Sequence, residues 1–392
     1  MLKNLTIDEL EVGMFVKDII LKNSDHKVKN QGIVNSPRTI ELLKKQGVVR
    51  VVIECDEEAA NDTTSVEPKD NNDTSDKASS EVSLAEEFSR SCEVYDQAAE
   101  HVKQLFLDAS IAKPLTTESM NNLASDITDS IVRNEHAMTI LTRIRQKSNY
   151  QWEHAINSSV LICGFALYLG LKKETVKEIT LGALLHDVGT AKVSKTILEK
   201  KGDLTANEMS VVKKHVFWGV ELSKRDGFAS PIIIDMLVNH HERLDGSGYP
   251  RGLKKEKLSK LSRITAIIDV YDAMSGDKPY KKGELPQAVL RHLLKEKEKF
   301  DPEIVQQFIK YLGIHPVGTL VKLSNDKLAV VLEGNRIEPL KPIIKVIYSL
   351  KLNHYTKPVE HDLTEEDFGI VAAVQPSDYQ INLNKIIREI VT

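Results

Sequence analysis

The chain has 392 residues, a formal net charge of −4 at pH 7 and three cysteines. Its length is sufficient for two or three domains, and its weak negative charge excludes a strongly basic protein with general affinity for nucleic acids. Few, widely spaced cysteines and the lack of a signal-peptide pattern predict a cytoplasmic protein, and the longest apolar run, residues 160–171, is too short to span a membrane.

The first 55 residues are expected to form a small α+β domain. Ser36-Pro37 is typical of a helix start and Gly47 of a helix end. The predicted elements are strands at 14–21 and 27–34, a helix at 36–46 and a valine-rich strand at 48–55. Residues 56–83 are rich in Asp, Asn, Ser, Thr and Glu, which predicts a flexible acidic linker, with an acidic docking tail as the alternative.

From residue 84 onward the pattern is helical. Apolar side chains such as Leu84 and Phe88 recur at helical spacing and predict a helical connector at 84–149. These stripes favour a buried core, and a dimer seam is the alternative with the same spacing. A further helical domain is expected at 150–315.

The last part of the chain changes character after residue 315. Short runs rich in β-branched and other apolar residues are set off by turn residues such as Gly318 and Gly334. These runs occupy residues 319–323, 328–332 and 343–350. They predict a small β-rich C-terminal unit at 316–392, whose role the sequence does not indicate.

Histidines and carboxylates are concentrated in the second helical stretch. His240-His241-Glu242 is followed at once by Asp245-Gly246-Ser247-Gly248-Tyr249-Pro250, and His186-Asp187 ends the apolar run at 181–185. The others in this stretch are His154, His215, Asp269 and Asp272. Carboxylates in apolar surroundings are costly unless they are paired or bound to metal, and imidazoles are common ligands of transition metals. Taken together, these residues favour a metal centre assembled from several segments over isolated buried histidines.

This combination of residues resembles the HD-GYP group of the HD-domain phosphohydrolases, which are bacterial phosphodiesterases that open cyclic di-GMP. The resemblance runs from about residue 150 to 311 and includes Lys278-Pro279-Tyr280 and Phe300-Asp301-Pro302. It implies a mainly α protein whose core is an HD-domain helical bundle. Residues 10–14 also resemble a small domain of unknown function that is often found ahead of HD-GYP domains.

The resemblance implies a centre with two transition-metal ions, iron or manganese, although zinc would accept the same ligands. Asp187 would bridge the ions, and a hydroxide held between them would be the nucleophile. The implied ligands are His154, His186, Asp187, His215, His240, His241 and Asp269.

The resemblance also implies a substrate side of the centre. Lys278 and Lys281 would face the phosphates, and Asp272, one turn beyond Asp269, would order the ligands. The substrate-side residues carried over from the family are Gly246, Gly248, Tyr249, Asp272, Lys278 and Lys281.

Two positions depart from the family pattern. Thr190 stands three residues after Asp187, where a lysine is common, so it joins His186 and Asp187 among the catalytic residues without supplying their usual cationic neighbour. Tyr150 stands four residues before His154, where members with a third metal carry a glutamate. This second departure favours a centre with two metals.

The expected function is therefore a metal-dependent phosphodiesterase that hydrolyses cyclic di-GMP to linear pGpG, with GMP as a candidate further product. Thr190 keeps open a different class of function, a degenerate HD-GYP module that binds the cyclic dinucleotide and signals through a partner. A hydrolase of another cyclic dinucleotide, such as cyclic GMP-AMP, is a third reading. The sequence does not choose between a homodimer and a signalling partner.

Overall fold

A computed structural model gives the fold of two compact units, residues Met1–Lys77 and Ala78–Thr392, and each is described by itself. The structure describes residues 2–10, 15–21, 27–33, 40, 43–45, 48–54, 82–143, 150–277 and 282–391. Most of the predicted acidic linker, its residues 56–81, lies outside this set.

The first unit is built on a four-stranded antiparallel sheet in the order β1-β4-β2-β3. Its elements are β1 (Leu2–Thr6), a 3-10 turn at Ile7–Glu9, β2 (Phe15–Leu21), β3 (Lys27–Ile33) and β4 (Val48–Glu54). Valine-rich β4 lies in the middle of the sheet and buries Val48 and Val51 with Ile19 of β2. The three predicted strands are confirmed, and β1 was not predicted. Of the predicted helix at 36–46, residues 40 and 43–45 are helical and the rest lies outside the described residues.

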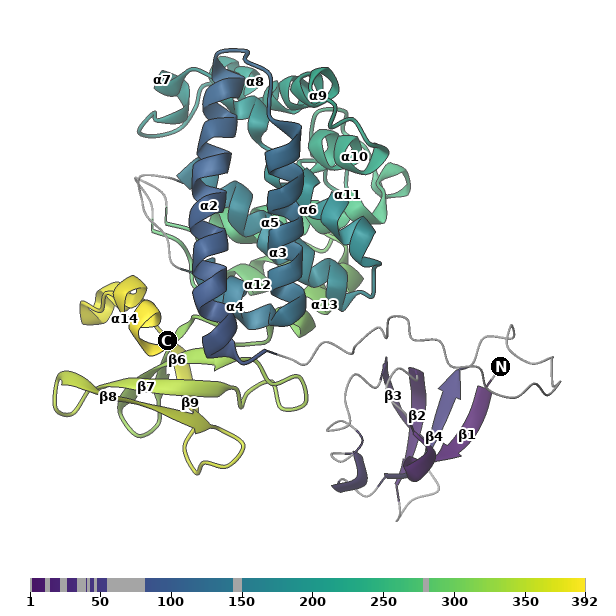
Figure 1. Cartoon of the computed structure of the whole chain (residues 1–392), viewed down its shortest axis with the longest axis vertical. Helices are drawn as coiled ribbons and strands as arrows, with labels where there is room; N and C mark the ends of the chain where they lie inside the picture. The colour runs from purple at the N-terminus through teal and green to yellow at the C-terminus, as the bar shows by residue number, and fades with distance from the viewer. Residues whose placement is uncertain are drawn as a thin grey trace, which may run out of the picture. The chain divides into compact units, whose positions relative to one another are not determined.

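The second unit begins with two long helices that lie side by side (Figure 1). These are α2 (Leu84–Ser110) and α3 (Thr117–Arg133), and the short α4 (Glu135–Leu141) follows. The buried carboxylate of Glu87 on α2 accepts hydrogen bonds from Arg133 Nε at 2.7 Å and Arg133 Nη2 at 2.9 Å, which ties α2 to α3. Both α2 and α3 pack on α5 (Tyr150–Tyr168), and α3 also packs on α6 (Lys173–Leu185). Residues 84–143 therefore form part of one helical core and not a separate connector.

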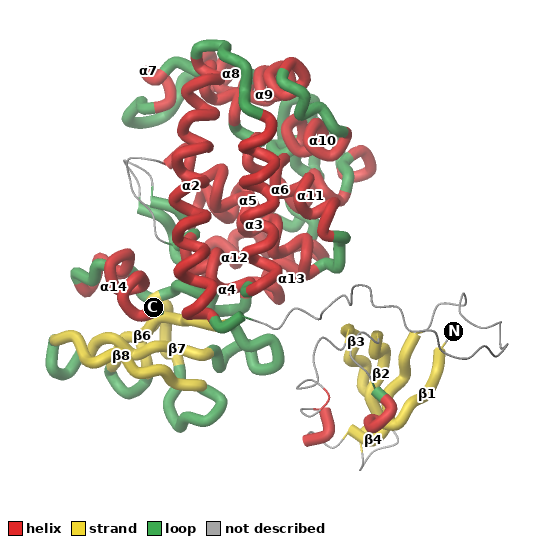
Figure 2. Tube along the Cα trace, in the orientation of Figure 1, coloured by secondary structure: helices red, strands yellow, loops and turns green. Residues whose placement is uncertain are grey.

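The next helices carry or support the candidate metal ligands, and Figure 2 shows them in red above, beside and behind α2 and α3. They are α5 (Tyr150–Tyr168), α6 (Lys173–Leu185), a 3-10 turn at Val188–Lys192, α7 (Lys195–Leu198), α8 (Ala206–Lys213), α9 (His215–Arg225), α10 (Pro231–Asn239), a 3-10 turn at Lys255–Lys257, α11 (Lys260–Ser275), α12 (Pro286–Lys295) and α13 (Pro302–Leu312). A capping box begins α8, because the Thr205 hydroxyl accepts a hydrogen bond from Glu208 N and the Glu208 carboxylate accepts one from Thr205 N. The prediction of a mainly α protein is confirmed.

The C-terminal part contains a five-stranded antiparallel sheet in the order β8-β7-β6-β5-β9. Its elements are β5 (Leu320–Leu323), β6 (Lys327–Glu333), β7 (Ile343–Ser349), β8 (His354–Asp362), β9 (Ile370–Ala373), a 3-10 turn at Pro376–Tyr379 and α14 (Leu383–Ile390). The three predicted β runs correspond to β5, β6 and β7, whereas β8, β9 and α14 were not predicted. The sheet is not independent of the helices, because buried side chains such as Val330 and Ile344 belong to the same apolar cluster as Phe88 and Phe165.

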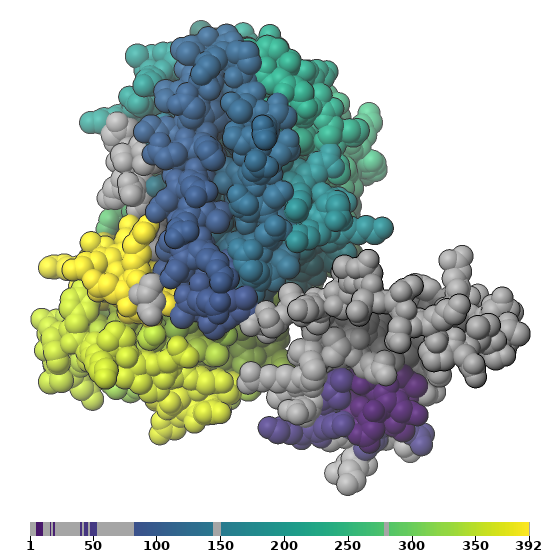
Figure 3. Space-filling model, in the orientation of Figure 1, coloured from purple at the N-terminus to yellow at the C-terminus, as the bar shows by residue number. Residues whose placement is uncertain are grey.

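Polar contacts reinforce this shared core at three places. Arg336 of the C-terminal part pairs with Glu135 on α4 at 2.6 Å. Lys282 Nζ donates to Ser377 Oγ at 2.7 Å, and Gln375 Nε2 donates to the carbonyl of Gly283 at 3.1 Å. Figure 3 shows the yellow residues of α14 against the blue residues of α2. No helix in the described part of the chain is both long and apolar enough to cross a bilayer.

Candidate metal centre

The seven candidate ligands lie in or at the ends of five helices that converge in the second unit. His154 lies within α5 and Asp269 within α11. The other five are placed at helix ends. His186 and Asp187 follow α6, His215 is the first residue of α9, and His240 and His241 follow α10. The apolar residues at 181–185 and 264–268 are almost all buried, so they anchor the segments from which the polar side chains extend. The structure brings all seven side chains together.

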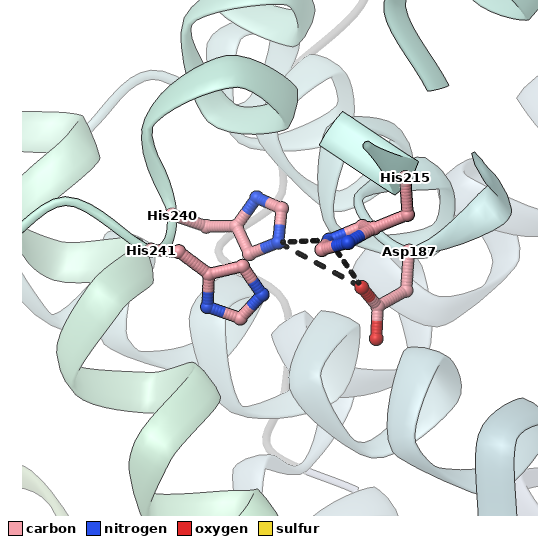
Figure 4. A group of neighbouring side chains, drawn as sticks. All are labelled: Asp187, His215, His240 and His241. Carbon is pink, nitrogen blue, oxygen red and sulfur yellow. Dashed lines mark hydrogen bonds and ion pairs between the residues drawn. The ribbon is translucent and has the colours of Figure 1, made fainter. Parts of the chain in front are cut away.

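The ligand atoms form two groups that could each hold a metal ion. One group consists of Asp187, His215, His240 and His241 (Figure 4), and the other of His154, His186 and Asp269. Within each group the ligand atoms lie within 4.8 Å of one another.

The carboxylate of Asp187 lies between the two groups. Its Oδ1 is 3.3 Å from His215 Nε2 and 3.7 Å from His240 Nε2. Its Oδ2 is 3.7 Å from His186 Nε2 and 3.9 Å from His154 Nε2. One oxygen therefore faces each group, which is the geometry required of a carboxylate that bridges two ions.

Asp269 makes a second connection between the groups. Its Oδ1 lies 3.1 Å from His154 Nε2, and its Oδ2 lies 3.5 Å from His241 Nδ1. Asp269 is buried, so its carboxylate would be costly without cationic partners.

Hydrogen bonds to main-chain carbonyls turn the imidazoles toward the centre. His186 Nδ1 donates to Ala183 O at 2.7 Å, His215 Nδ1 to Val212 O at 2.7 Å, and His240 Nδ1 to Leu237 O at 3.0 Å. With the proton on Nδ1, each Nε2 keeps its lone pair for a metal. His154 Nδ1 donates instead to Asp272 Oδ2 at 2.7 Å. Asp272 is fully buried behind His154, so its position suits a residue that orients a ligand and not one that contacts substrate.

The spacing of the imidazole nitrogens fits bound cations. His154 Nε2 and His186 Nε2 are 3.3 Å apart, and the same distance separates His215 Nε2 from His240 Nε2. A cation shared by the two nitrogens of either pair would attract both of their lone pairs. Neutral imidazole nitrogens with two carboxylates form a donor set that suits iron, manganese or zinc.

The environment sets the protonation of these ligands. Burial lowers the pKa of His186 to about 4, and it also lowers the pKa of His215 and His241, so all three are neutral at pH 7. Burial acts in the same direction on His154, but its hydrogen bonds with Asp269 and Asp272 outweigh burial and raise its pKa to about 10. A metal ion would take the place of that proton on Nε2.

The carboxylate of Glu242 holds the Gly-rich loop after His241 through hydrogen bonds from main-chain N–H groups. This buried carboxylate accepts from Arg251 N at 2.8 Å and from Leu253 N at 2.9 Å. Gly248 passes so close to the loop start that a Cβ there would lie 2.5 Å from Glu242 Cα and 2.5 Å from His241 O. Gly246 adopts the left-handed conformation with φ of 81°. Sequence reasoning gave Glu242 no role, although its position between the histidines and the glycines was the available signal.

This loop places Tyr249 beside the metal ligands. Its N–H donates to His241 O at 3.2 Å, and its ring centroid lies 4.6 Å from that of His241. Tyr249 is therefore in the position expected of a residue that meets a bound substrate.

The Thr190 hydroxyl is engaged in a hydrogen bond within its own turn and is not a free proton donor. Its side chain is buried, and its hydroxyl donates to the carbonyl of Asp187 at 2.7 Å, parallel to its own N–H at 2.9 Å. The nearby Lys192 is paired with Glu221 at 3.1 Å.

Lys278 and Lys281 lie outside the described residues. Tyr150 stacks on His154 with ring centroids 5.9 Å apart.

The helical core and the centre are those of an HD domain, and the model of the HD-domain family matches residues 134–304. A family described as a domain of unknown function matches residues 2–120, and a KOW domain associated with HD domains matches residues 320–382. A cyclic di-GMP phosphodiesterase of Pseudomonas aeruginosa is 33% identical over 359 residues, which cover 90% of this chain and 86% of that protein. The chain belongs to the HD-GYP family of cyclic di-GMP phosphodiesterases.

Other relatives match shorter parts. A cyclic di-GMP phosphodiesterase of Borreliella burgdorferi is 30% identical over 201 residues, which cover 51% of this chain and 53% of that protein. A 3'3'-cGAMP-specific phosphodiesterase of Vibrio cholerae is 29% identical over 199 residues, covering 50% of this chain and 38% of that protein. The family therefore includes relatives with two different named substrates.

Proposed function

We propose that this protein binds two iron or manganese ions and hydrolyses cyclic di-GMP to linear pGpG. The observation that carries the proposal is the position of Asp187, with one carboxylate oxygen facing each of two histidine groups. Two metal ions bound there would activate a water as nucleophile and neutralise charge on the phosphate.

The chain's own residues would orient the metal ligands and position the dinucleotide. The imidazoles of His186, His215 and His240 are held by carbonyls in the tautomer that leaves Nε2 free, so little reorganisation is needed on binding. Tyr249 would lie against the bound dinucleotide. Gly246 and Gly248 would support this contact by letting the loop fold closely on itself beside His241 and Glu242. Lys278 and Lys281 remain the proposed phosphate contacts from the sequence. A complete ligand set supports catalysis over a module that only binds, and the two free cysteines in the described part of the chain fit a cytoplasmic setting.

Cyclic GMP-AMP is the second candidate substrate, because a relative named for that specificity covers half of the chain. Nothing in the ligand set distinguishes guanine from adenine, since the metals would meet the phosphate and not the bases.

The test is a substrate panel. Protein loaded anaerobically with iron or manganese is incubated with cyclic di-GMP, cyclic GMP-AMP and cyclic di-AMP, and products are separated by chromatography. We expect pGpG as the first product, with activity and metal content both lost in Asp187→Ala. Tight dinucleotide binding without product after hours, at about two metal ions per chain, would contradict catalysis and favour the binding module.

A further inference from the structure

A cyclic dinucleotide has two phosphodiester anions on opposite sides of its macrocycle. When one of them lies on the metals, the other lies away from them and needs a separate counter-charge. The metal ligands offer no partner for this second anion, and Thr190 supplies no cation either. Lys278 and Lys281, the phosphate contacts proposed from the sequence, lie outside the described residues.

Lys213 is placed to meet that anion. It is the last residue of α8, two positions before the candidate ligand His215, and its side chain is exposed. Its Nζ lies 4.9 Å from the centroid of the Tyr249 ring, which in turn contacts the ring of His241. The ammonium group is thus one aromatic ring away from a metal ligand.

The Lys213 ammonium group has no carboxylate partner within 4.0 Å among the residues that the structure describes. Two other cations near the centre, in the described part of the chain, are already engaged. Arg243 donates to the carbonyls of His240 and Glu242 and lies over the ring of Phe300, and Lys192 is paired with Glu221. A cation held on an aromatic face without a counter-ion keeps its charge available for a ligand.

We infer that Lys213, held on the ring of Tyr249, forms a subsite for the phosphodiester that is not being cleaved. The inference rests on the proposed function, since it requires a substrate with two phosphates. Lys213 would act in binding and positioning and would take no part in bond cleavage. A lysine offers a point charge with rotatable donors, so it can follow this phosphate while the metals hold the other.

The neighbouring Lys214 provides a matched control. It is exposed like Lys213 and follows it directly, and no ring contact or ion pair is recorded for its ammonium group in the described part of the chain. Lys213→Gln, Lys214→Gln and Lys213→Arg are compared as metal-loaded full-length protein. Each is assayed with cyclic di-GMP and with bis(p-nitrophenyl) phosphate, which has a single phosphodiester and needs only the metals.

In Lys213→Gln we expect KM for cyclic di-GMP to rise roughly tenfold, the value of one lost charged hydrogen bond. Its kcat, its metal content and its hydrolysis of bis(p-nitrophenyl) phosphate should match the wild type. Lys213→Arg should recover most of the affinity, and Lys214→Gln should resemble the wild type. The KM of Lys213→Gln should also depend less on salt.

Equal KM values in Lys213→Gln and Lys214→Gln would overturn the subsite, as would an equal loss toward both substrates in Lys213→Gln. The two proposals fail in distinguishable ways. A wild type that cleaves bis(p-nitrophenyl) phosphate but no cyclic dinucleotide would overturn both, whereas an active wild type with indistinguishable lysine variants would overturn the subsite alone.

Discussion

The hydroxyl of Thr190 stabilises the turn that carries Asp187. Side chain and main chain of Thr190 both donate to the Asp187 carbonyl, at 2.7 and 2.9 Å, so the hydroxyl proton is already used within the turn. The 3-10 turn at Val188–Lys192 then leads away from the centre, with Lys192 bound to Glu221. In this conformation the Thr190 side chain therefore has no proton to donate to the leaving group.

Thr190→Val tests this role, because valine keeps the shape and removes the hydroxyl. We expect the free energy of unfolding to fall by about 1 kcal/mol, while kcat for cyclic di-GMP changes only a few-fold. Chemical denaturation and steady-state kinetics measure the two quantities, and Thr190→Ser serves as the control that retains the hydroxyl. A large loss of kcat with unchanged stability would show instead that the hydroxyl reaches the reacting phosphate.

At this scale the sequence predicted residue types well and their partners poorly. The histidines and carboxylates beside apolar runs predicted a metal centre, because buried carboxylates are costly unless they are paired or bound to metal. The set of seven candidate ligands came from the resemblance to the HD-GYP family, and the structure places these side chains together. The role of Glu242 was not predicted. Its position between the histidines and the glycines was a signal, but its partners are the main-chain N–H groups of Arg251 and Leu253, which almost any residue type could supply. Likewise, nothing in the motif shows that the Thr190 hydroxyl is taken up by a carbonyl.

Among the elements, α2 and α3 are joined by an ion pair between the partly exposed Arg133 and the buried Glu87. Burial raises the pKa of the Glu87 carboxyl, but hydrogen bonds from Arg133 and Ser130 outweigh it and hold the pKa below its ordinary value. A depressed pKa in the folded state means that this carboxylate stabilises the fold above its unfolded pKa, and that the contribution is lost as the pH falls through the folded pKa.

Glu87→Gln should therefore lower the free energy of unfolding by roughly 2 kcal/mol at pH 7, since it removes the charge but keeps the size. The difference from the wild type should shrink as the pH falls below about 4.5, the ordinary value for this group. Denaturant titrations of both proteins across this range measure it. Glu86→Gln is the control, because Glu86 makes only an exposed pair with Arg90. A difference that stays constant with pH would exclude the carboxylate charge as the cause.

The prediction of helices and strands succeeded where the local sequence pattern determines the element and failed where tertiary contacts determine it. The valine-rich β4 and the capped α8 have strong local signals. β8 is an edge strand whose side chains are mostly exposed, so it lacks the apolar alternation that marks a buried strand. The apolar stripes at 84–149 favoured a buried core over a dimer seam, but the sequence could not identify the helices that cover them, which the fold shows to be α5 and α6.

At the scale of the whole molecule, the metal ligands connect segments that are distant in sequence. They lie in or at the ends of five helices between His154 and Asp269, so ions bound to them would cross-link these five helices of the second unit. Since an unfolded chain offers no such assembled site, metal binding should stabilise the folded state by mass action.

We compare protein whose centre is saturated with metal and the same protein after a chelator has removed the metal. We expect the melting temperature of the second unit's transition to be lower by roughly 5–10 °C after chelation. Scanning calorimetry of chelated and manganese-replete protein measures the shift. Asp187→Asn should melt at one temperature in both conditions. Identical melting of the wild type with and without metal would contradict a metal centre that spans these helices.

The shared core of the helices and the C-terminal sheet limits how the gene can be divided. Cutting after residue 315 would remove buried Leu320, Val330 and Ile344 from a cluster that they complete, and would leave apolar helical surface facing water. Gly318 lies so close to Arg143 that a Cβ would meet its side chain at 2.7 Å, so even the junction is fitted to the helical side. A hybrid that exchanges this β unit between relatives would have to exchange the opposing residues with it. In recombination and library design, residues 78–392 should be inherited as a single block.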